Sequence, residues 1–75
     1  MSADLPVAGQ VYRVGAEASI QFQGSRELTF RVIRVDERAT YEGWLWLDGY
    51  VLDALGNAVD RRTIFVRRAG LRSRP

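Results

Sequence analysis

The chain has 75 residues, of which 11 are basic and 9 acidic, and its formal net charge at pH 7 is +2. A single domain of this size buries only about 60% of the surface that its unfolded form exposes, so its stability depends on tight packing or on self-association. The chain contains neither cysteine nor histidine, which excludes disulfides, a thiol nucleophile, an imidazole base and the usual zinc ligands. We therefore predict no enzyme activity, no bound cofactor and no metal site.

The first residues show no basic segment followed by a long apolar run, which argues against a signal peptide. No stretch approaches the roughly 20 apolar residues of a membrane span, so no membrane partner is expected. The absence of cysteine is compatible with a reducing compartment. We predict a cytoplasmic protein of bacterial or phage origin.

Every basic residue is an arginine, and the arginines are concentrated toward the C-terminus. Residues 61–75 contain six of the eleven and no acid, whereas residues 1–60 contain all nine acids and carry a net charge of −4. Guanidinium groups bind phosphate through paired hydrogen bonds. A basic end of this kind is therefore typical of a surface that meets phosphate groups.

Apolar and polar residues alternate with period two along most of the chain, and no segment repeats with the helical period of 3.6. We expect a loose lead-in over 1–9 and a short edge strand or irregular arm over 10–14. Residues 18–23 alternate strictly and are predicted to form the first clear strand, joined by a turn at 24–26 to a second strand at 28–32. The alternation slips after Val32, which predicts a bulge or sharp bend near Ile33. The pairs expected in this first hairpin are Phe22–Leu28, Ile20–Phe30 and Ala18–Val32.

Two further strands are predicted at 44–52, which is long and apolar, and at 62–66, which is rich in β-branched and aromatic residues. We expect them to form a hairpin with a two-residue turn at Gly56 and Asn57. A helix over 52–62 is the alternative, and glycine and asparagine in its centre disfavour it. Residues 69–71 are expected to turn, and residues 72–75 to form a mobile basic tail.

Four or five strands in roughly 60 residues, one of them bent, indicate an all-β fold and a small antiparallel barrel over 10–71. The succession of a hairpin, a bent strand, a long hairpin and a terminal turn resembles SH3-like barrels. This resemblance consists of spacing alone, since no family motif is present. An OB-like barrel is the alternative, although it usually needs more residues and a helix between strands.

The register of the second hairpin decides where its aromatic rings lie. With a two-residue turn, Leu47 would face Val66 on one side and Trp46 would face Arg67 on the other. The aliphatic side would then be the core, and the other side would expose Trp44, Trp46, Tyr50 and Phe65 together with Arg61, Arg67 and Asp48. Such a strip on so small a domain indicates a binding surface. The alternatives are that the tryptophans are core residues, with a bulge at Gly49, or that they form a dimer seam.

Aromatic rings beside arginines favour nucleic-acid binding, because rings stack on bases while guanidinium groups contact phosphates. Without a helix for the major groove, we expect single-strand or backbone contact that is largely independent of sequence. Trp46 and Phe65 are the predicted stacking platforms. The full predicted site consists of Arg61, Arg62, Arg67, Arg68, Arg72, Trp44, Trp46 and Phe65.

A second hypothesis uses residues 41–53, which combine aromatic rings with carboxylates and contain no arginine. Such a surface suits a cation, including a methylated lysine or arginine held in an aromatic cage. It would also dock the basic end of another copy of the chain, giving a homo-oligomer. The residues of this protein–protein or self-assembling adaptor site are Tyr41, Glu42, Trp44, Trp46, Asp48 and Tyr50.

Overall fold

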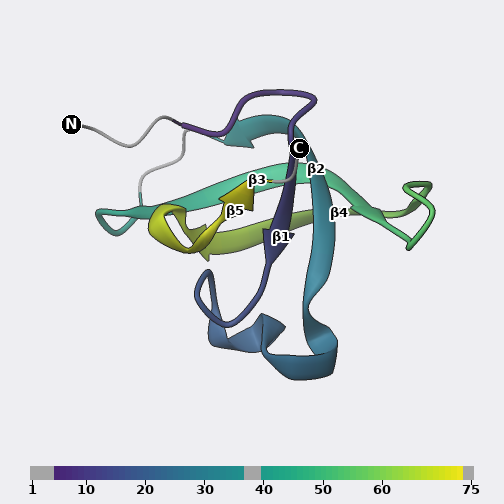
Figure 1. The fold of residues 1–75 in the computed structure, drawn as a ribbon. Helices are drawn as coiled ribbons and strands as arrows, with labels where there is room; N and C mark the ends of the chain where they lie inside the picture. The colour runs from purple at the N-terminus through teal and green to yellow at the C-terminus, as the bar shows by residue number, and fades with distance from the viewer. Residues whose placement is uncertain (1–4, 37–39, 74–75) are drawn as a thin grey trace.

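The structure is a computed structural model, and it describes residues 5–36 and 40–73. Within these residues the chain forms strands and short 3-10 turns and no α-helix, which confirms the all-β prediction (Figure 1). The strands are β1 (Val11–Val14), β2 (Leu28–Asp36), β3 (Trp44–Leu52), β4 (Ala58–Arg67) and β5 (Arg72–Ser73). The 3-10 turns are η1 (Ile20–Phe22), η2 (Gly24–Arg26) and η3 (Arg68–Gly70).

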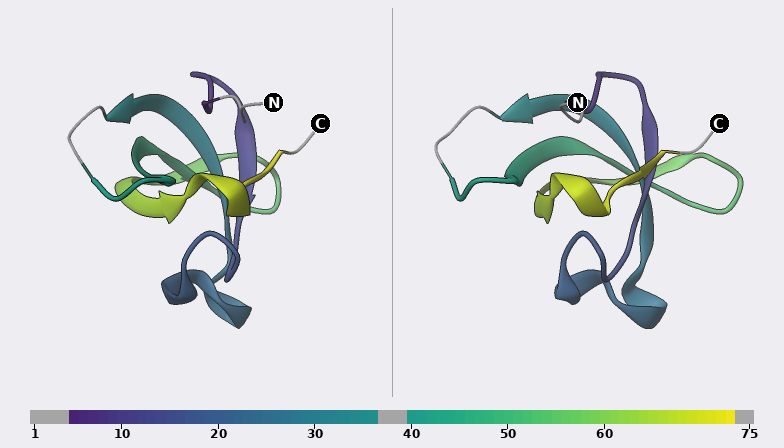
Figure 2. Two further views of the ribbon diagram at one scale, coloured as in Figure 1. Left: turned by 90° about the vertical axis from the view of Figure 1, so that its left-hand side faces the viewer. Right: turned by 60° about the vertical axis from the view of Figure 1, so that its left-hand side comes forward.

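All five strands belong to one antiparallel sheet, in the order β4-β3-β2-β1-β5. The register between β2 and β3 shifts between Val32 and Arg34, which confirms the predicted bulge near Ile33. β2 bends strongly, so that its two halves run in different directions (Figure 2). β4 and β5 are at opposite ends of the strand order and do not pair with each other. The fold is thus an open five-stranded antiparallel sheet.

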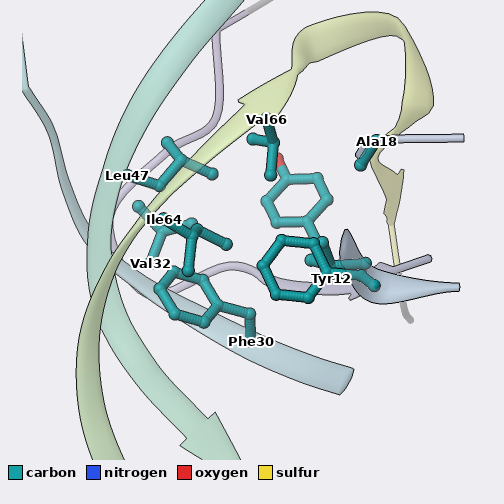
Figure 3. Close-up of a cluster of buried hydrophobic side chains, with 9 residues drawn as sticks. Tyr12, Ala18, Phe30, Val32, Leu47, Ile64 and Val66 are labelled. Atoms are coloured by element: carbon teal, nitrogen blue, oxygen red, sulfur yellow. The ribbon is translucent and has the colours of Figure 1, made fainter. Parts of the chain in front are cut away.

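The core lies on one face of this sheet, where alternate side chains of four strands meet (Figure 3). Tyr12 of β1 lies opposite Phe30 of β2, and Leu47 of β3 lies opposite Ile64 of β4. The largest fully buried side chains are Phe30, Leu47, Val14, Val32 and Val66. We call this side of the sheet the inner face and the opposite side the outer face.

Two glycines allow close approaches that the core requires. A Cβ atom on Gly49 would lie 2.6 Å from Cε2 of Phe30 and 2.3 Å from the backbone oxygen of Arg31. A Cβ atom on Gly70 would lie 2.0 Å from the backbone oxygen of Glu17. Gly49 therefore makes room for the Phe30 ring, and Gly70 lets the η3 turn pack against the segment that follows β1.

The strand predicted over 18–23 is wrong, because residues Ile20–Phe22 and Gly24–Arg26 form 3-10 turns. β2 has two edges, which β3 and β1 occupy, so no ladder position remains for residues 18–23. Ala18 and Phe22 are buried nevertheless, whereas Ile20 is 76% exposed. The expected pairs Phe22–Leu28, Ile20–Phe30 and Ala18–Val32 therefore do not form.

Both ends of the domain are more ordered than predicted. The segment expected at 10–14 to be an edge strand or an arm is β1, which is not at the edge because β5 also pairs with it. β5 contains the first two residues of the predicted mobile tail, while residues 74–75 lie outside the described residues. In the predicted lead-in, the Gly9 N–H donates to the Val32 oxygen at 2.8 Å, and residues 1–4 lie outside the described part. The turn predicted over 69–71 corresponds to η3.

The β3–β4 hairpin is present, but its turn is wider than the predicted Gly56-Asn57 pair. The Asp53 carboxylate accepts the N–H groups of Leu55 and Asn57, both at 2.9 Å, and so stabilises a loop over 53–57. This loop displaces the register by three residues at Leu52 and Ala58, and a bulge at Val59 reduces the displacement to two over the rest of the hairpin, so that Phe65 rather than Arg67 lies opposite Trp46. A displacement of two leaves the side chains of Trp44–Val51 and Asp60–Arg67 on their predicted sides of the sheet.

Candidate functional site

The predicted site residues of β3 lie on the outer face. Trp44, Trp46, Asp48 and Tyr50 alternate with inward-facing residues such as Leu47, which is fully buried. Both indoles are half-buried and neither belongs to the core cluster, so the alternative in which the tryptophans are core residues is wrong. The rings are less exposed than predicted, because they cover one another.

Four aromatic residues form a cluster at the start of the hairpin, and we call Tyr41, Trp44, Trp46 and Phe65 the aromatic cluster. The ring of Phe65 is stacked on Trp44, with centroids 4.9 Å apart and planes 21° apart. Trp46 contacts the same ring at 4.8 Å and 36°, and Tyr41 lies 6.5 Å away. Phe65 is thus already packed against two indoles of its own chain, and the indoles themselves offer the ring surface for a ligand.

Arg67 and Arg68 flank this cluster. Arg67 lies opposite Trp44 in the β3–β4 ladder and is exposed. The backbone N–H of Arg68 donates to the oxygen of Gly43 at 2.8 Å, which fixes the η3 turn beside the start of β3. Within residues 5–36 and 40–73, neither guanidinium group has an acidic partner. Arg67 is therefore available to an anionic ligand beside the rings, and Arg68 follows it in the η3 turn.

The other arginines of the predicted site are engaged in ion pairs. Arg61 donates to Asp48 from Nη2 at 2.9 Å and from Nε at 3.3 Å. Arg62 donates to Asp60 at 2.9 Å, and Arg72 lies 4.0 Å from Glu17. Among the arginines of the predicted site, Arg67 and Arg68 are next to the aromatic cluster along the chain. These two have no acidic partner among the described residues.

Asp48 is the most enclosed charged residue of the outer face, with 9% of its surface exposed. The hydrogen bond from Arg61 holds the pKa of Asp48 below its ordinary value, although burial opposes that shift. Arg34 of β2 lies 3.8 Å from the same carboxylate and lowers its pKa further. The same hydrogen bond raises the pKa of Arg61. The negative charge of Asp48 is thus offset by Arg61 and Arg34, and the carboxylate attracts a cationic ligand only weakly.

The remaining residues of the alternative docking site are dispersed. Tyr41 is 75% exposed and Glu42 is also exposed, but Tyr50 lies further along β3, where the Arg31 guanidinium is 5.9 Å from its ring centre. An aromatic cage needs rings that stand apart to admit a cation. Centroids under 5 Å apart are in contact, so Phe65 and the two indoles enclose no such space.

Sequence reasoning assigned no residue of β2 to this surface, yet Arg31 and Arg34 lie on it, opposite Tyr50 and Asp48. The signal was present, because the predicted bulge at Ile33 moves Arg34 to the same side of β2 as Arg31. A hollow of about 590 Å³ adjoins Arg31, between β1, β2 and the 53–57 loop. No pattern in the sequence pointed to that hollow.

No protein family model, curated protein or solved structure matches this chain. In the part of the chain that the structure describes, no helix is long and apolar enough to cross a membrane. The same residues contain no group of three or more acidic, histidine or cysteine side chains placed to hold a metal ion. The functional assignment therefore depends on the chemistry of the outer face.

Proposed function

We propose that the protein binds single-stranded nucleic acid through the aromatic cluster and the two arginines beside it, with little dependence on base sequence. The observation that carries this proposal is the position of Trp44. Its indole is stacked on Phe65 at 4.9 Å, and on the neighbouring strand Arg67 lies directly opposite it. A base on the indole and a phosphate on the guanidinium group are then adjacent.

The packing of the rings supports stacking as the main contact. Phe65 holds both indoles before any ligand arrives, so less side-chain freedom is lost on binding. Each base stacked on an aromatic side chain contributes about 1–3 kcal/mol, and the contact accepts any base. Bases inside a duplex cannot reach such a surface, which favours single strands.

The ion pairs make the expected salt dependence smaller than the arginine content suggests. Arg61, Arg62 and Arg72 have acidic partners, which leaves Arg67 and Arg68 as the phosphate contacts at the cluster. Each phosphate contact with a single strand contributes about −0.7 to the slope of log K against log salt concentration. Two contacts predict a slope of about −1.4 for a strand that reaches only the cluster.

We also infer that the sheet is of the SH3-like type. The strand order, the bent β2, the long β3–β4 hairpin and the 3-10 turn before a short last strand support this inference. An OB-like barrel usually carries a helix between strands, and the described residues contain none.

Titration with a fluorescein-labelled deoxythymidine decanucleotide at low salt tests the proposal. We expect tryptophan quenching and a dissociation constant that rises with salt. Trp44→Leu keeps an apolar side chain on Phe65 but removes a stacking surface, so we expect affinity to fall about tenfold. Arg26→Ala is the control, since Arg26 is exposed on η2, away from the cluster. The absence of binding at low salt, or equal losses in both variants, contradicts the proposal.

Docking of a basic segment is the competing hypothesis, and the exposed Tyr41 beside Glu42 is the observation that favours it. Titration with an arginine-rich peptide and with its methylated form distinguishes the two. We expect weak binding of both peptides, because Asp48 is already paired with arginines of its own chain. Binding of the methylated peptide in preference to the oligonucleotide would reverse the assignment.

A further inference from the structure

The hollow beside Arg31 lies at the other end of the hairpin from the aromatic cluster. Its volume of about 590 Å³ is within the range of roughly 300–1,000 Å³ for small-molecule sites. The 53–57 loop forms one wall, and in the ribbon this loop lies at the far end from the start of β3 (Figure 1). The lining residues that carry the following argument are Val11, Arg31, Leu52, Asp53 and Leu55.

The hollow belongs to the same face of the sheet as the aromatic cluster. Leu52 follows Tyr50 at a spacing of two on β3, and Tyr50 lies on the same side of the strand as Trp46. Leu52 is 9% exposed, yet it is not part of the core cluster. Its side chain is therefore covered on the outer face, where it forms part of the hollow.

The lining combines apolar side chains with one basic residue, Arg31. The Arg31 guanidinium lies over the Tyr50 ring, and within residues 5–36 and 40–73 it has no acidic partner. The acidic residue of the lining, Asp53, already accepts two backbone N–H groups of its own loop. The hollow thus suits a ligand with an apolar or flat body and an anionic group that reaches Arg31.

We infer that this hollow receives further nucleotides of the strand bound at the aromatic cluster, with a phosphate on Arg31. This inference rests on the function proposed above. Trp44 and Tyr50 are six residues apart on β3, a distance of roughly 20 Å along a strand. A stacked nucleic-acid strand advances about 3.4 Å per nucleotide, so about six stacked nucleotides cover that distance, and an extended strand needs fewer.

The surface between the two ends is compatible with such a path. Asp48 is the acidic residue of β3 on this path, and Arg61 and Arg34 lie 2.9 Å and 3.8 Å from it. Arg34 also lies 4.0 Å from Asp36 of β2, so the two positive charges offset these two carboxylates. A phosphate chain therefore crosses this part of β3 without meeting an unpaired carboxylate of that strand.

An oligonucleotide length series with Arg31→Ala tests the inference. We expect the wild type to bind a deoxythymidine decanucleotide at least about tenfold more tightly than a trinucleotide, because only the longer strand reaches Arg31. Arg31→Ala should remove most of this difference and leave trinucleotide binding unchanged. Arg26→Ala removes the same charge elsewhere and should preserve the length dependence. Circular dichroism checks that each variant is folded.

The possible results separate this inference from the proposed function. If Arg31→Ala weakens the trinucleotide and the decanucleotide equally, or weakens neither, the hollow is not part of the binding path although the cluster still binds. If neither oligonucleotide binds the wild type, the proposed function fails, and the inference fails with it. A length dependence that Leu55→Ser also reduces supports the hollow, because Leu55 is 86% exposed at its rim.

Discussion

The two faces of the sheet are built by the same strands but hold their side chains differently. On the inner face, Leu47 and Val66 are fully buried among aliphatic and aromatic neighbours. On the outer face, Trp46 and Phe65 remain half-buried, and the carboxylate of Asp48 is held by Arg61 in an ion pair. Period-two alternation permits this division, because successive residues of β3 point to opposite sides. Stability and ligand binding should therefore respond to different substitutions.

The inner face should carry most of the folding free energy. A domain of this length has a free energy of unfolding of about 4–11 kcal/mol. Replacing one large buried side chain by a small one costs a large part of that free energy. A pair of stacked rings on the surface contributes only about 0.5–1.5 kcal/mol beyond the area it buries. Measuring the free energy of unfolding of variants on each face tests whether the inner face carries most of the stability.

Phe30→Ala should produce the largest effect. The ring is fully buried, and its removal leaves a cavity that the sheet cannot close, so we expect a loss of about 3–5 kcal/mol in the free energy of unfolding. Urea denaturation followed by tryptophan fluorescence measures it. Trp44→Leu is the outer-face counterpart, with an expected loss below about 1.5 kcal/mol. Equal losses in the two variants would contradict the division between the faces.

Gly49→Ala should come next, with a loss of about 1–3 kcal/mol. The added methyl group would meet the Phe30 ring and the backbone of Arg31, and the backbone cannot move without disturbing the β2–β3 ladder. Thr63→Ala, at an exposed position of β4, should change stability by less than about 0.5 kcal/mol. Unfolding experiments on both variants test the difference, and tolerance of alanine at position 49 would indicate a looser core than described.

The sequence predicted correctly which side chains of the hairpin lie on the outer face, because an even displacement of the register does not move a side chain to the other face. A bulge at Val59 offsets the odd change in loop length, so the displacement is even, and Trp46 and Phe65 lie on one side and Leu47 and Val66 on the other as predicted. The pairing itself was not predictable, because it depends on how the Asp53 carboxylate caps its loop. That interaction leaves no periodic signal in the sequence.

The segment 18–23 shows where alternation misleads. Ala18, Ile20 and Phe22 alternate as a strand would, but Ala18 lies in a turn and Phe22 in the 3-10 turn η1, and both are buried without joining the sheet. Residues 18–23 do not form a strand because β1 already pairs with the edge of β2 that they were predicted to occupy. The sequence also did not predict which arginines form ion pairs and which remain unpaired among the described residues, since this depends on which strands lie side by side.

Acid titration sharpens the comparison at Asp48. Its pKa is lowered in the folded protein, so its contribution to stability is present above its unfolded pKa of about 3.9 and is lost as pH falls through the lower folded value. The wild type should therefore lose its stability advantage over Asp48→Asn between about pH 4 and the folded pKa. Urea denaturation over a pH series measures the difference. An advantage that persists at the lowest pH would show that Asp48 stabilises the fold by packing rather than by its charge.

The smallest effect should distinguish two arginines of β4. Arg67 has no acidic partner among the described residues, whereas Arg61 is held by Asp48. If Arg67 contacts a phosphate, Arg67→Ala should make the salt slope of decanucleotide binding shallower by about 0.7. Arg61→Ala should leave that slope unchanged while lowering stability, because it removes the hydrogen-bonded partner of an enclosed carboxylate. Salt titrations of both variants provide the comparison. An equal change of slope in both would mean that the ligand displaces Asp48 from Arg61, and the outer face would then bind phosphate along the whole of β4 rather than at its aromatic end.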